Sequence, residues 1–101
     1  MTPIKTQLTQ DLAAVQWEDL MPHAQRDAVI VVTALLDLVE VGVAIAQDDT
    51  QQVQRWISEQ LIYKPSAAQL SAWNLHPDQV FSALIVQPFV LIRADQSPTP
   101  V

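Results

Sequence analysis

The chain contains no cysteine, and this absence excludes several kinds of chemistry. Without thiols the protein forms no disulfide framework, binds no metal through thiolates and has no cysteine nucleophile. Glycine is scarce too, with one residue in 101, so we expect short loops stiffened by the seven prolines. Basic residues are also few. Five Lys and Arg stand against eleven Asp and Glu, and the formal net charge of -6 repels polyphosphates and anionic membranes.

The length and the apolar content predict one folded domain. A chain near 101 residues buries roughly two-thirds of its unfolded surface, and 50% of these residues are hydrophobic, which is too many for a disordered protein. We expect an α+β domain over residues 1–95, and a disordered tail over residues 96–101 because the tail has nothing to bury. No basic start leads into an apolar stretch, so the cytoplasm is the expected location.

The most apolar segment, residues 28–46, carries only two charges, Asp37 and Glu40. On insertion scales these acids would cost roughly 5 to 7 kcal/mol, which cancels the gain from the neighbouring Val, Ile and Leu, so we expect no membrane span. The β-branched run over residues 28–32 instead predicts a buried strand. Asp37 and Glu40 have the spacing of an acidic capping box, which predicts a helix that starts at Leu38.

Capping residues and apolar spacing also predict helices elsewhere in the chain. The expected segments are an N-terminal helix with Ile4, Leu8, Leu12 and Val15 on one side, a helical turn over 17–21 ended by Pro22, a helix capped by Asp49 with Val53, Trp56, Ile57 and Leu61 on its apolar side, and a helix capped by Ser66 with Gln69 and closed by Trp73.

Three regions are expected to form strands, namely residues 28–32, the surroundings of Ile62, and residues 80–92. Pro88 interrupts the last of these, and since proline cannot donate to a sheet, the region predicts one bent strand or a tight pair. The expected fold class is therefore α+β, with a small β-sheet packed against a central helical hairpin and flanking helices.

Most of the chain outside its two ends resembles the small bacterial family known only as domain of unknown function 2288. The resemblance lies in five stretches: Trp17-Glu18-Asp19-Leu20, Leu36-Asp37-Leu38-Val39-Glu40-Val41, Ala44-Ile45-Ala46-Gln47-Asp48-Asp49, Val53-Gln54-Arg55-Trp56 and Pro88-Phe89-Val90-Leu91-Ile92. None of them is a catalytic signature. The resemblance implies one folded domain and no particular activity.

The leading functional hypothesis is a soluble module that binds another protein or a second copy of itself and has no catalytic activity. Its basis is the high apolar content of a short chain, together with a sheet edge expected to be open at Pro88. Nucleic acid and membranes are not expected as partners, and we expect no cofactor and no metal.

A first alternative is DNA binding, because residues 43–65 are similar to the helix-turn-helix of small MerR-like and excisionase-like domains. In that hypothesis four side chains on the second helix would face base edges, namely Gln51, Gln52, Gln54 and Arg55. Two departures weigh against it. Asp48 and Asp49 occupy the turn, and few cations are available nearby to neutralise phosphates.

A second alternative is a small hydrolytic or metal-dependent enzyme, which would need a histidine to meet carboxylates in a cleft. His23 and His76 each lie beside a proline in a predicted connection, with no nearby Ser or Cys nucleophile. Asp37 and Asp48 lie at opposite ends of a predicted helix, roughly 16 Å apart, so they cannot share one ion. The tryptophans are expected in the core, and an exposed aromatic side chain would indicate an interface.

Overall fold

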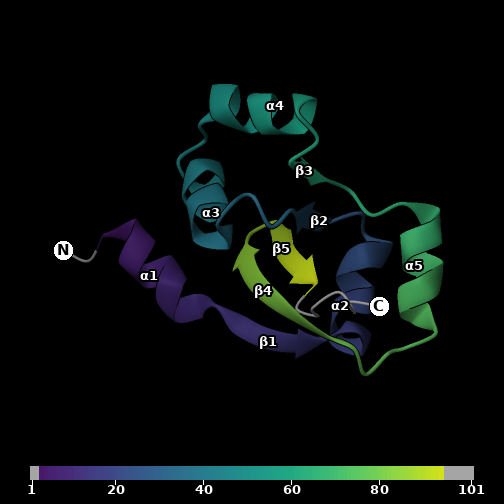
Figure 1. The fold of residues 1–101 in the computed structure, drawn as a ribbon. Coiled ribbons are helices and arrows are strands. Elements are labelled where there is room, and N and C mark those ends of the chain that lie inside the picture. The colour runs from purple at the N-terminus through teal and green to yellow at the C-terminus, as the bar shows by residue number, and fades with distance from the viewer. Residues whose placement is uncertain (1–2, 95–101) are drawn as a thin grey trace.

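The computed structural model describes residues 3–94, which form a five-stranded mixed sheet with helices on both faces (Figure 1). The strand order is β1-β4-β5-β2-β3, in which β5 and β2 are parallel and the other neighbours antiparallel. The elements are α1 (Ile4–Asp11), β1 (Ala13–Gln16), α2 (Trp17–Gln25), β2 (Val29–Val32), α3 (Leu38–Ala46), α4 (Thr50–Ser58), β3 (Ile62–Tyr63), α5 (Ala67–Asn74), β4 (Val80–Val86) and β5 (Phe89–Ala94). The predicted α+β class is confirmed.

The three helix starts predicted from capping residues are confirmed. At the start of α3, Asp37 Oδ1 accepts a hydrogen bond from the backbone N–H of Val39 at 3.1 Å. The donor is two residues after the cap, whereas in a capping box it is three residues after the cap. Asp49 Oδ1 accepts from the N–H of Gln52 at 3.3 Å at the start of α4. Before α5, Ser66 and Gln69 form a complete capping box. These caps depend on local bonds, so the sequence pattern was sufficient to find them.

The beginning of the chain departs from the prediction. The N-terminal helix was expected to include Val15, but α1 ends at Asp11 and residues 13–16 form β1 instead. β1 pairs with β4, where Val15 stands opposite Phe81. The strand forms because its backbone groups can form hydrogen bonds with those of β4. The spacing of apolar residues along the chain does not reveal this long-range pairing.

The helical turn over residues 17–21 was also predicted too short. α2 continues to Gln25 and contains Pro22, which was expected to end it. A proline inside a helix removes one backbone hydrogen bond. Burial compensates for that loss, because Trp17 and Leu20 on the same helix are 1% and 2% exposed against the sheet.

Two apolar layers enclose the sheet. On one face α1, α3 and α4 pack through Leu8, Val41 and Trp56, and on the other α2 and α5 pack through Trp17 and Trp73. The rings of Trp17 and Trp73 lie 5.1 Å apart. All three tryptophans are buried, so their predicted place in the core is confirmed.

The strand region around Pro88 is a tight antiparallel pair, as one of the two predictions had it. Pro88 lies in the turn between β4 and β5, which are central strands, so the open sheet edge expected there was wrong. The edges are β1 and β3. Between residues 3 and 94, every helix falls short of the length and apolar character needed to cross a bilayer. The tail predicted over residues 96–101 lies outside the described residues.

Candidate binding groove

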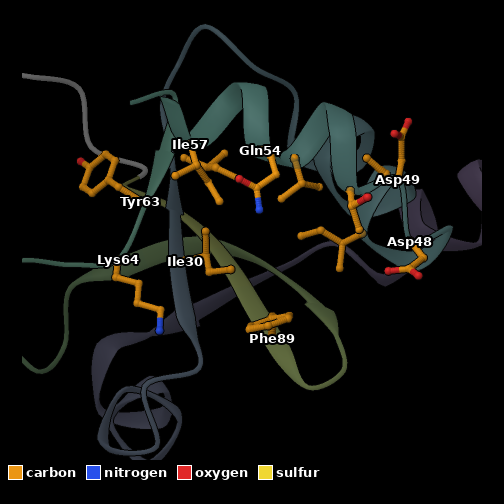
Figure 2. Close-up of a pocket in the computed structure, with 13 residues that line it drawn as sticks. Ile30, Asp48, Asp49, Gln54, Ile57, Tyr63, Lys64 and Phe89 are labelled. Atoms are coloured by element: carbon orange, nitrogen blue, oxygen red, sulfur yellow. The ribbon is translucent and has the colours of Figure 1, made fainter. Parts of the chain in front are cut away.

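An apolar groove of about 570 Å³ lies between α4 and the sheet (Figure 2). Ile30 of β2 and Phe89 at the start of β5 form its floor, and Ile57 of α4 lies in the wall above them. Val53 of α4 also lines the groove. The end of α3 closes one side through Ile45. We call this surface, with these five residues as its apolar lining, the groove.

The groove exists because α3 covers only part of its sheet face. Successive residues of a strand point to opposite faces, so Ile30 and Val32 of β2 share the face on which α3 and α4 lie. Val32 is fully covered, whereas Ile30 is only half-buried. α4 is anchored by Trp56, which is 8% exposed, and its neighbour Ile57 is left 51% exposed. The amphipathic helix therefore presents more apolar surface than the core takes up.

The two ends of the groove carry different charges (Figure 2). Asp48 and Asp49, in the turn between α3 and α4, lie at one end, and Lys64 lies at the other. The Nζ atom of Lys64 is 2.5 Å from Oδ2 of Asp27, so its charge is paired. The end of α3 and the start of α4 meet at this turn, so the negative end of one helix dipole lies beside the positive end of the other, and the charge here comes from the two carboxylates. The groove therefore has one acidic end and one end that is close to neutral.

Comparison with known proteins places the chain in a family. The model of the family described as Protein of unknown function (DUF2288) matches residues 3–94. The chain belongs to this family. The solution NMR structure of PA1075 from Pseudomonas aeruginosa is similar, with 30% sequence identity, a TM-score of 0.80, and coverage of 100% of this chain and 93% of that chain. No curated protein matches the chain. The resemblance seen in the sequence is confirmed. Neither match states a function.

The four residues of the DNA-binding hypothesis lie on α4 of this DUF2288 family member, but not in one environment. Gln51, Gln54 and Arg55 are exposed and Gln52 is half-buried, and of these side chains Gln54 points into the groove (Figure 2). The helical hairpin of α3 and α4 is present, with a connection of three residues. Reading of base edges by these side chains stays a prediction.

The histidines of the enzyme hypothesis lie away from the carboxylates at the groove. His23 belongs to α2, where its Nδ1 is 2.9 Å from Nη2 of Arg26, and His76 follows α5. Both of these helices cover the face of the sheet opposite to that of Asp48. Among residues 3–94, no three His, Asp or Glu side chains come together in a way that could hold a metal ion.

The sequence did not reveal the groove in this DUF2288 chain. Ile30 was expected in a buried strand and Ile57 on the apolar side of its helix, but periodicity predicts which face a side chain is on and not whether another element covers it. An exposed aromatic side chain was expected to indicate an interface, and the structure shows one at the groove, where Tyr63 is 37% exposed.

Proposed function

We propose that this DUF2288 protein is a protein-interaction module with no catalytic activity, and that a partner binds in the groove. The main support for this proposal is that the apolar residues lining the groove are partly exposed to solvent, above all Ile57, which is 51% exposed. Uncovered apolar surface of this kind is typical of binding sites, because its transfer from water to a partner is favourable.

The form of the groove favours a protein over a small molecule. Its volume of about 570 Å³ is within the usual range for ligand pockets. However, sites for small molecules cover most of the ligand and direct several polar groups toward it. Here the wall at Ile57 is open to solvent, and the charged groups lie at the two ends, although Gln54 points into the groove. An elongated partner with an apolar side fits this arrangement better.

The proposal can be tested without knowledge of the natural partner. Peptides of about 16 residues would be selected from a random displayed library and titrated into the ¹⁵N-labelled protein. We expect the amide signals of α4, β2 and the start of β5 to shift, and we expect Ile57→Glu to abolish binding because it places a charge in the apolar wall.

Leu75→Glu is the matched control, since Leu75 is 77% exposed at the end of α5 on the other face of the sheet. Circular dichroism would verify that both variants remain folded. Selected peptides that shift only the signals of other surfaces, or that bind the Ile57→Glu variant unchanged, would refute the proposed function.

A second candidate is self-association through the edge strand β1. Residues 12–16 contain no charge and no proline, the features that usually protect an edge, and Ala13, Ala14 and Gln16 are exposed. Sedimentation equilibrium would show a dimer at high concentration, and a monomer at every concentration would refute this candidate. The cytoplasmic location stays a prediction, which cell fractionation would test.

A further inference from the structure

We infer that the groove selects one class of partner, an amphipathic helix whose apolar stripe lies on Ile30, Ile57 and Phe89 and whose lysine or arginine meets Asp48 and Asp49. This inference rests on the proposed function and specifies the partner of the same site. It combines the apolar lining of the groove with the charge at its acidic end.

Among residues 3–94, no cationic side chain forms an ion pair with Asp48 or Asp49. Asp48 and Asp49 are both exposed, and the ion pair found within residues 3–94 joins Lys64 to Asp27 instead. Asp49 uses one oxygen to accept from the N–H of Gln52 and keeps its negative charge available to solvent. A cationic side chain on the partner is therefore the complementary group.

The strand beside the groove is poorly suited to the addition of an extended peptide. β3 contains only Ile62 and Tyr63, and it is followed by a charged lysine and by Pro65, which has no N–H to donate. A helix needs no backbone partner. Its residues at i, i+3 or i+4, and i+7 form one apolar stripe that can lie between α4 and the sheet.

A second copy of this chain is a poor occupant. Each copy has a net charge of -6, so a second molecule would bring like charge to the acidic end. The charge difference between the two ends also gives the partner a direction. Its basic residue lies at the turn between α3 and α4, and its neutral end lies near Lys64.

The test uses three synthetic peptides of about 16 residues that share one leucine stripe and differ at one end, which carries Lys, Gln or Glu. Fluorescence anisotropy would measure their affinities, and ¹⁵N spectra would locate their binding. We expect the Lys peptide to bind about two- to fivefold more tightly than the Gln peptide at low salt, and the Glu peptide to bind most weakly. High salt should reduce these differences.

Asp48→Asn with Asp49→Asn is the informative variant. Asn is accepted at the φ of 59° found at position 48 and is a good N-cap at position 49, so both local structures are retained. We expect this variant to lose the preference for Lys over Gln. Asp19→Asn with Asp78→Asn changes the net charge equally at exposed sites away from the groove, and it should keep the preference.

Each result decides between the two proposals. Equal affinity of the three peptides at the groove, or an unchanged Lys preference in the Asp48 and Asp49 variant, would overturn this inference and leave the proposed function intact. If the amide signals at the groove shift with protein concentration in the absence of peptide, the occupant is a second copy of the chain and not the inferred helix. Shifts caused by 1-decanol but by none of the peptides would refute both proposals in favour of a small apolar ligand.

Discussion

The indole of Trp17 is expected to be among the most important side chains for stability. It is 1% exposed, and its ring centroid lies 5.1 Å from that of Trp73 and 5.8 Å from that of Phe81. Its Nε1–H donates to Oδ1 of Asn74 at 2.8 Å. Trp17→Ala should cost about 3–5 kcal/mol, a large part of the roughly 5–15 kcal/mol that stabilises a small domain. A smaller change is therefore more informative.

Trp17→Phe retains an aromatic ring but removes the Nε1–H donor and replaces the fused pair of rings by a single ring. We expect the lost hydrogen bond to cost roughly 1 kcal/mol and the small cavity roughly 1 kcal/mol more. Asn74→Ala removes the same hydrogen bond from the other side. The double variant should therefore be more stable than the sum of the two single effects predicts, by about 0.5–1.5 kcal/mol.

Urea unfolding followed by far-UV circular dichroism measures these free energies, since tryptophan fluorescence would itself change with Trp17. The m-value should stay constant, which shows that the variants unfold from the same compact state. A loss below about 0.5 kcal/mol for Trp17→Phe, or full additivity with Asn74→Ala, would refute this account of the core.

Three further predictions concern the helices and DNA. Gly42→Ala should lower the free energy of unfolding in urea by about 1 kcal/mol, because a Cβ there would lie 2.8 Å from Cδ2 of the buried Leu84. This overpacking outweighs the gain in helix propensity. An unchanged unfolding midpoint would contradict this, because it would mean that the Leu84 side chain moves aside at no cost. Gln60→Gly should raise the midpoint of thermal unfolding and add about 0.5–1 kcal/mol of stability, because Gln60 follows α4 with a φ of 61°, which glycine adopts without strain. A lower midpoint would contradict this. Titration of mixed DNA duplexes at low salt should give no change in anisotropy; salt-sensitive binding that Arg55→Ala weakens would revive the DNA-binding hypothesis.

The parts of the fold that the sequence predicted are those with local causes. The caps at Asp37, Asp49 and Ser66 bond to backbone groups two or three residues away, so the starts of three helices could be found from spacing alone. β1 was missed because its hydrogen bonds come from β4, which is more than sixty residues away. The extension of α2 past Pro22 was missed because burial against the sheet, a tertiary effect, decides it.

The groove was harder to predict for a related reason. Ile30 and Phe89 are distant in sequence and come together only because β2 and β5 are parallel neighbours. The exposure of Ile57 depends on where α4 is held by the elements that it packs against, α3 and β3. Strand order and helix placement set both features, and neither leaves a periodic pattern in the chain.

Intermolecular nuclear Overhauser effects between the Lys peptide and the protein provide the most direct test that the groove binds an apolar stripe. Isotope-filtered spectra of the complex would identify which protein side chains lie against the peptide. We expect contacts from the peptide leucines to the methyl groups of Ile57 and Ile30 and to the ring of Phe89. Contacts confined to other surfaces, such as Leu75 or β1, would contradict this expectation.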